Sequence, residues 1–280
     1  MINQDNLILE HEAFSREDME QRMSGGGFNS LSKFELFVWD LEMFLQFQKK
    51  LGDRIILKGG AATQFYVPIS AQRTSIDIDM ICLASREEVH EVIQKIENDF
   101  RGIGEYCKLK LYNPRKPKLG LEALETFYMT VPSVCNVNEL RATRGKQEVK
   151  IEFLFSEDVY TINKIIEPDL FALETRREFN ILSFENLFAD KLTTLGPNTI
   201  GIPEERSDEQ VKQVYDVITL FLHNYDRVLE NKQTIISNYE KVARTECAIH
   251  NLPYDSRVLL DDMKDMINRF KDIESDESLL

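Results

Sequence analysis

The chain has 280 residues, of which 42% are hydrophobic, and it carries a formal net charge of −14. This length leaves room for one large globular domain or two modest ones. The excess of acid argues against a protein that coats nucleic acid, because its summed field repels phosphates. No signal peptide is evident, the four cysteines are scattered, and no apolar run is long enough to span a membrane. We therefore expect a cytoplasmic protein.

The predicted elements change in character along the chain. Residues 1–32 are polar and predict an N-terminal arm. Ser32 and Glu35 form a capping-box pattern in front of an amphipathic helix over 33–51. The segments predicted after this helix are a strand at "RIILKG", a short helix at "AATQFYV", a strand at "SIDIDMICL", a helix capped by Ser85 and Glu88, β-structure over 106–156, and helices near 184–195, 209–224, 228–249 and 256–272.

This order predicts an α+β fold. A small mixed sheet with flanking helices is followed by segments that are helical only. We expect the arm to be followed by a sheet-containing domain over 33–175 and a C-terminal helical domain over 176–280.

Two aspartates stand one residue apart in the strand "SIDIDMICL". Alternate side chains of a strand share a face, so Asp77 and Asp79 point the same way, about 6–7 Å apart. Two carboxylates at this spacing repel each other and lose hydration unless a positive charge lies between them. Mg²⁺ commonly binds one or two protein carboxylates together with substrate phosphates. The pair therefore predicts a magnesium site.

Two further features accompany the aspartates. Glu152, in "QEVKIEFLF", faces away from the apolar row of its strand, which leaves open a third metal ligand or an exposed strand residue. Gly59 and Gly60 stand at a strand-to-helix turn, where backbone N–H groups can approach a phosphate closely. The combination predicts a phosphate-binding turn beside a metal site.

The stretch "KGGAATQFYV…RTSIDID" resembles the signature of the DNA polymerase β-like nucleotidyltransferase superfamily. The lysine before the glycines and the Arg-x-Ser-x-Asp-x-Asp pattern are similar to the AbiEii/AbiGii toxin family, the nucleotidyltransferases of abortive-infection and type IV toxin–antitoxin systems. The resemblance covers about residues 36–225. It implies a small nucleotidyltransferase domain followed by a helical domain, with Mg²⁺ as cofactor and an NTP as substrate.

The resemblance also implies roles for individual residues. Catalytic roles fall to Asp77, Asp79, Glu152, Lys191 and Asp216, of which the first three hold the metal. Nucleotide-binding roles fall to Lys58, Gly59, Gly60, Arg73, Ser75 and Lys191.

Lys191 and Asp216 lie in the C-terminal helices. Lys191, in "LFADKLTTL", is on the apolar stripe of its helix, so we expect its ammonium to contact a triphosphate or Asp77 and Asp79. Asp216, in "KQVYDVITLF", matches an Asp-x-x-Asp pattern of the family in which Gln213 replaces the first acid. Asp216 falls off the apolar stripe of its helix, which predicts a solvent-facing side chain paired with Lys212.

These features together predict transfer of a nucleoside monophosphate from an NTP to an acceptor hydroxyl. By analogy with the family, the acceptor is a tRNA 3′ end or another RNA, contacted by the basic stretches 108–118 and 141–150, and a cognate antitoxin is the expected partner. Two alternatives stay open. One is a resistance-type enzyme that modifies a small molecule, and the other is an inactive relative that serves as a binding partner.

Overall fold

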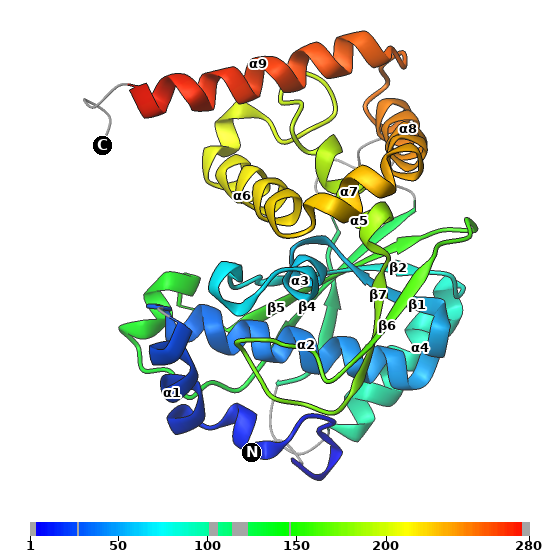
Figure 1. The fold of residues 1–280 in the computed structure, drawn as a ribbon. Coiled ribbons are helices and arrows are strands. Elements are labelled where there is room, and N and C mark those ends of the chain that lie inside the picture. Colours follow the sequence, from blue (N-terminus) through cyan, green and yellow to red (C-terminus); the bar gives the residue numbers. More distant parts are fainter. Residues whose placement is uncertain (1–3, 27, 101–105, 114–122, 146, 276–280) are drawn as a thin grey trace. The chain divides into compact units, whose positions relative to one another are not determined.

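The computed structural model describes residues 4–26, 28–100, 106–113, 123–145 and 147–275 (Figure 1). The chain divides into two compact units, with the division between Ser183 and Phe184. Unit 1 holds the sheet, and unit 2 holds the C-terminal helices. No helix in these described ranges is long and apolar enough to cross a membrane.

The sheet confirms the predicted α+β class. In the described part of unit 1 it has seven strands in the order β3-β4-β5-β2-β1-β7-β6. The strands are β1 (Ile55–Lys58), β2 (Asp77–Cys82), β3 (Leu109–Leu111), β4 (Leu124–Thr130), β5 (Glu148–Phe155), β6 (Ile162–Ile166) and β7 (Glu178–Leu182). The central strand β2 pairs parallel with β5 and antiparallel with β1, and β1 pairs parallel with β7. The sheet is therefore mixed.

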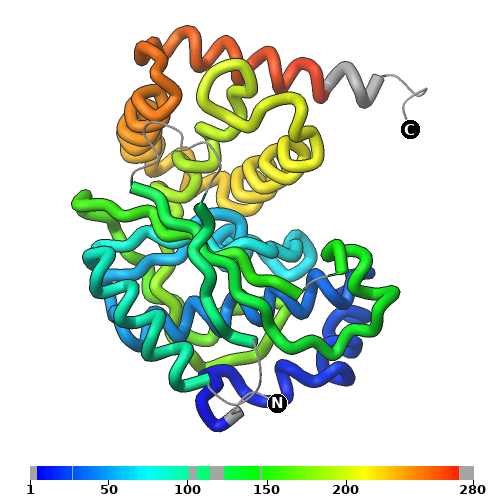
Figure 2. Tube along the Cα trace, turned by 180° about the vertical axis from the view of Figure 1, so that it is seen from behind, coloured from blue at the N-terminus to red at the C-terminus, as the bar shows by residue number. Residues whose placement is uncertain are grey.

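One face of the sheet is covered by α2 (Leu31–Leu51), which lies in front of the strands in Figure 1 and behind β4 and β5 in Figure 2. Phe47 of α2 meets Phe153 of β5 edge-on, with 5.0 Å between ring centroids. The β2–β5 register sets Met80 beside Phe153, so these side chains share the apolar face. Asp77 and Asp79, which alternate with Met80, lie on the opposite face.

The remaining helices of unit 1 are α1 (Arg16–Gly26), α3 (Gly59–Thr63) and α4 (Arg86–Asp99). The predicted capping box of Ser85 and Glu88 is present at the start of α4. His90 of α4 packs edge-on against Phe127 of β4, which shares the face of Phe153, so α4 also covers the apolar face.

The predicted N-terminal arm packs against unit 1. Leu9 and Met19 are buried, and the carboxylate of Glu42 in α2 accepts the backbone N–H of Leu9 at 2.9 Å. Arg16 of α1 donates through two nitrogens to Glu139, at 3.0 and 2.6 Å.

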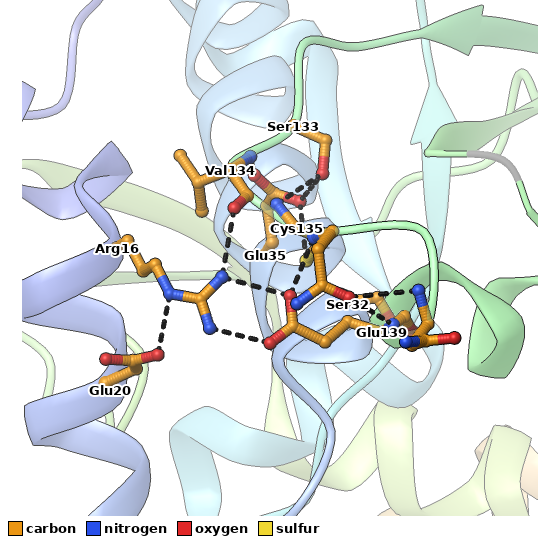
Figure 3. A network of polar contacts seen from close by, with 10 residues as sticks. Arg16, Glu20, Ser32, Glu35, Ser133, Val134, Cys135 and Glu139 are labelled. Carbon is orange, nitrogen blue, oxygen red and sulfur yellow. Dashed lines mark hydrogen bonds and ion pairs between the residues drawn. The ribbon is translucent and has the colours of Figure 1, made fainter.

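The β4–β5 connection is fixed to α2 by one buried acid, Glu35 (Figure 3). Its carboxylate accepts the Ser133 hydroxyl at 2.6 Å, the Val134 backbone N–H at 2.7 Å and the Gln147 amide at 2.5 Å. Three donors far along the chain thus meet one side chain, and this contact holds Ser133, Val134 and Gln147 on α2.

Unit 2 is helical. Its helices are α5 (Phe184–Thr193), α6 (Ser207–His223), α7 (Tyr225–Glu230), α8 (Lys232–Ile249) and α9 (Ser256–Ser275). A small core of Ile200, Ala243, Cys247 and Leu259 joins the α5–α6 connection to α8 and α9.

The orientation of α6 differs from the prediction. The apolar stripe off which Asp216 falls in the sequence was expected to face the core, but four of its residues are 41–64% exposed: Val211, Tyr215, Ile218 and Leu222. The buried positions are instead mostly polar: Gln210, Asp216, Thr219 and Leu220. The period of the pattern identified the helix, but its apolar stripe faces solvent because the polar face has a charged partner on α5.

Candidate active site

Two rows of polar side chains cross the sheet on the face opposite α2. Cross-strand partners in register lie side by side on the same face. The first row runs from β1 through β2 and β5 to β4: Lys58, Asp79, Glu152 and Thr126. The second runs from β2 through β5 and β4 to β3: Asp77, Lys150, Tyr128 and Lys110. The register thus brings the three predicted acids together.

Lys150 places a positive charge among these acids. Its Nζ lies 2.7 Å from Glu152 Oε2 and 3.9 Å from Asp77 Oδ2. Thr126 donates its hydroxyl to the other oxygen of Glu152 at 3.0 Å. The sequence placed Lys150 on the same face as Glu152, but the strand pattern alone did not assign it a role, because its proximity to Asp77 depends on the β2–β5 register.

The acids differ in how readily they ionise. Burial, followed by the negative charge of Glu152, raises the pKa of Asp79 to about 7, although Lys58 opposes this rise. Burial also opposes ionisation of Glu152, but the charge and hydrogen bond of Lys150 outweigh it and lower the pKa of Glu152. Burial would lower the pKa of Lys150, yet Asp77 and Glu152 raise it. The cluster therefore keeps Lys150 charged and resists full ionisation of its acids.

Of the two glycines of the predicted phosphate turn, Gly59 is required by its backbone conformation and by a close contact, whereas Gly60 faces the ends of two side chains. Gly59 has a φ of +68°, and a Cβ there would overlap Asp79 Oδ2. A Cβ on Gly60 would lie 2.9 Å from Ser75 Oγ and 3.0 Å from Arg73 Nη2. The structure thus gathers the predicted nucleotide-binding residues of unit 1 around the N-terminus of α3, next to Asp79.

The donor set fits a hard divalent cation in one mode. Within the described ranges, no three His, Cys, Asp or Glu side chains converge into a ready-made metal site. Two carboxylates from one strand, with the remaining positions filled by phosphates and water, match the usual binding of Mg²⁺. Because Gly59 lacks a side chain, the Asp79 carboxylate has room on that side. Asp77 and Asp79 therefore fit Mg²⁺ as a pair, while Glu152 is already held by Lys150 and Thr126.

A fourth acid, Asp40 of α2, was missed by the sequence analysis. Asp40 is only 1% exposed, and neither of its carboxylate oxygens has a hydrogen-bond partner. Burial, and then the charges of Asp77 and Asp79, raise the pKa of Asp40 well above its ordinary value. In the sequence it is one polar residue within an amphipathic helix, a pattern that carries no signal for burial.

Lys191 and Asp216 meet inside unit 2. The Lys191 ammonium donates to Asp216 Oδ2 at 2.7 Å and to Gln213 Oε1 at 2.9 Å. The expectation of a solvent-facing Asp216 paired with Lys212 is wrong, because residue 216 is only 1% exposed. Gln213, which stands where the family pattern has an acid, is a neutral acceptor for the same ammonium. The buried group of Lys191, Asp216 and Gln213 therefore contains one positive and one negative charge.

The two basic stretches are only partly described. In 108–118, residues 114–118 lie outside the described residues. Lys108 precedes the edge strand β3, Lys110 lies within it, and both lysines are exposed. In 141–150, Lys146 lies outside the described residues, Arg141 and Arg144 are exposed, and Lys150 belongs to the acidic cluster.

Comparisons with solved structures gave matches of low identity. MenT4, a nucleotidyltransferase toxin from Mycobacterium tuberculosis H37Rv, is 12% identical with a TM-score of 0.45; the match covers 71% of this chain and 62% of MenT4. A nucleotidyltransferase-like antigenic protein from Paracoccidioides brasiliensis is 11% identical over 87% of this chain and 90% of its own, with a TM-score of 0.43. JHP933 from Helicobacter pylori is 12% identical over 95% and 98%, with a TM-score of 0.33.

Curated protein sequences gave no match. A family model did, and it confirms the resemblance drawn from the Gly-Gly and Asp-x-Asp patterns. The model, described as the nucleotidyl transferase AbiEii toxin of type IV toxin–antitoxin systems, matches residues 44–278. The chain therefore belongs to the AbiEii nucleotidyltransferase toxin family.

Proposed function

We propose that the protein transfers a nucleoside monophosphate from an NTP to an acceptor hydroxyl. The observation that carries the proposal is the cluster of Asp77, Asp79 and Glu152 on one face of the sheet, directly beside Gly59. Membership of the AbiEii family supports the same reaction.

In the proposed reaction, the acceptor oxygen attacks the α-phosphorus of the NTP. The bond from the α-phosphorus to its bridging oxygen breaks, its electron pair leaves with pyrophosphate, and the hydroxyl proton passes to Glu152 or to water. Mg²⁺ held by Asp77 and Asp79, with Glu152 as a third carboxylate if it does not act as base, would neutralise charge on the phosphates.

The remaining residues position the nucleotide. Gly59 and Gly60 allow the backbone at the start of α3 to approach a phosphate, and Arg73 and Ser75 beside Gly60 offer donors to it. Lys58 would add a positive charge opposite Asp79.

The charged pair of unit 2 takes part in this proposal through the family resemblance. Lys191 would contact the triphosphate, and Asp216 would orient the ammonium through the hydrogen bond that it accepts.

The acceptor we propose is an RNA 3′ end, with tRNA as the candidate, and the protein would act as a growth-arresting toxin with a cognate antitoxin. The net charge of −14 keeps a second candidate in play, a small-molecule acceptor, since an acidic surface repels RNA. An RNA acceptor therefore requires a local surface that attracts phosphates.

The test measures pyrophosphate release and RNA labelling with each NTP, Mg²⁺ and total cellular RNA. Asp77→Asn and Asp79→Asn should abolish both signals while the thermal midpoint stays equal or rises, because each change relieves repulsion between acids. Asp158→Asn, at an exposed position outside the cluster, is the matched control and should retain turnover. Full turnover in the Asp79 variant, or unfolding of both site variants, would contradict the proposal.

A further inference from the structure

A strip of aromatic and basic side chains leads from the acidic cluster to the edge of the sheet. The register sets Lys150 beside Asp77, Tyr128 beside Lys150, and Lys110 beside Tyr128. Tyr112, two residues after Lys110, donates its backbone N–H to Thr126 O at 2.8 Å. It therefore lies beside Thr126, the last residue of the first row. Neighbouring strands lie about 4.8 Å apart, so the three steps from β2 to β3 span about 14 Å.

The two tyrosines of this strip form one aromatic surface. Their rings meet edge-to-face, with 5.8 Å between centroids. Tyr112 is 52% exposed, and Tyr128 beside it is half-buried. The contact with Tyr128 thus supports the Tyr112 ring, about half of whose surface is open to a ligand.

The basic groups of the edge strand share this face. Lys108 and Lys110 alternate with Leu109 on β3 and its preceding residue, so both lysines point to the side of Tyr112. In a chain of net charge −14, two lysines next to an exposed ring form a local surface on which a phosphate and a flat base can bind together.

We infer that the strip of Lys108, Lys110, Tyr112 and Tyr128 binds the single-stranded end of an RNA acceptor, an inference that rests on the proposed nucleotidyl transfer. Tyr112 stacks on a base, and Lys110 contacts the adjoining phosphate. A strand bound along the strip extends its terminal ribose toward Lys150 and the acids, where its hydroxyl is needed. Single-stranded RNA is recognised in this way for two reasons. Every base offers a flat face to an aromatic ring, and the phosphates of the backbone offer negative charges to the lysines.

The strip also fits two roles that involve no RNA. Lysines on an edge strand prevent pairing with neighbouring chains, a role that needs no ligand. The exposed ring could also stack on the base of the NTP rather than on the acceptor. Measuring the binding of RNA and of NTP independently separates both roles from RNA binding.

The first measurement is the binding of a short, fluorescein-labelled single-stranded RNA by anisotropy, without NTP or Mg²⁺. Tyr112→Ala should weaken binding about ten-fold, the scale of one lost base stack, and Tyr112→Trp should restore it. Lys110→Gln should weaken binding and flatten its dependence on salt. Tyr225→Ala is the matched control, since Tyr225 is 49% exposed and meets Phe221 edge-to-face at 5.4 Å.

The second measurement is the steady-state KM for each substrate. Tyr112→Ala should raise the KM for RNA and leave the KM for NTP unchanged. A raised KM for NTP alone would assign the ring to the donor base and overturn the inference, as would equal RNA binding by the wild type and Tyr112→Ala. If RNA binds through Tyr112 but no nucleotide is transferred, the strip is upheld and the proposed reaction fails.

Discussion

The ammonium of Lys191 lies 2.7 Å from Asp216 Oδ2, and their side chains are only 4% and 1% exposed. Removing one member of a buried pair leaves the other charge without compensation, which costs about 3–5 kcal/mol. We expect Lys191→Ala to lower the free energy of unfolding by this amount, as measured by urea denaturation. Its loss of activity would therefore include a loss of folded protein.

The matched control is a double variant, Lys191→Met with Asp216→Leu, which removes both charges and keeps apolar volume. It should be far more stable than Lys191→Ala, because no uncompensated charge remains. If the double variant is folded but does not bind NTP, the pair acts on the nucleotide as well as on stability. Equal stabilities of Lys191→Ala and the wild type would show that the pair is not buried in solution.

Gly59→Ala should abolish turnover. A residue with a side chain at a φ of +68° costs about 1–2 kcal/mol, and the added methyl group would also displace the Asp79 carboxylate. Gly145→Ala is the control, because Gly145 has a φ of +78° with no atom within 4 Å of an added Cβ. It should lose similar stability in thermal unfolding and keep its rate of pyrophosphate release. Normal turnover in Gly59→Ala would remove the turn from the site.

Glu35→Ala should loosen the β4–β5 connection. The change leaves the Val134 N–H, the Ser133 hydroxyl and the Gln147 amide without their acceptor, at about 1–3 kcal/mol for each donor that stays buried. Hydrogen exchange over 133–147 should accelerate. Glu17→Ala is the control, since Glu17 is exposed on α1 and the change leaves both Glu35 and the Arg16–Glu139 pair in place. Unchanged exchange in Glu35→Ala would mean that different contacts hold this connection.

Asp40 should make stability depend on pH. Since its pKa is raised well above 3.8, the folded chain keeps a proton that the unfolded chain releases above about pH 4. The free energy of unfolding attributable to Asp40 therefore falls as pH rises from this value toward the folded pKa. Asp40→Asn has no titrating carboxyl group, so its free energy of unfolding relative to the wild type should grow as pH rises above about 4, as measured by urea denaturation. A constant difference would show that Asp40 ionises normally.

Local patterns predicted the parts of the fold that depend on alternation. The strand pattern around Asp77 and the one around Glu152 both correspond to strands of the sheet, with their acids on the face opposite the apolar one. The capping box at Ser85 was also correct, because its two hydrogen bonds are local. The same pattern at Ser32 was wrong. There the hydroxyl donates to Glu139 O and Glu35 binds distant donors, and neither contact is encoded nearby.

The errors arose where distant segments decide the outcome. No element was predicted between residues 156 and 184, yet β6 and β7 form there, because β7 pairs with β1 and β6 pairs with β7. Short apolar runs fit a strand or a helix equally well until a pairing partner is known. The roles of Lys150 and Asp40 were not predicted for the same reason. Both residues interact with the aspartates of β2, which is far away in the sequence.

The parallel pairing of β2 with β5 determines when the site can form during translation. Asp77 and Asp79 leave the exit tunnel some seventy residues before Glu152 and Lys150, the partners that the register sets beside them. Because strand pairs distant in sequence form late, a nascent chain that stops before β5 has the two aspartates but no complete cluster. A growth-arresting activity built on this cluster would be absent from incomplete translation products. The cell that makes the protein would therefore be exposed to this activity only after β5 has been synthesised and paired with β2.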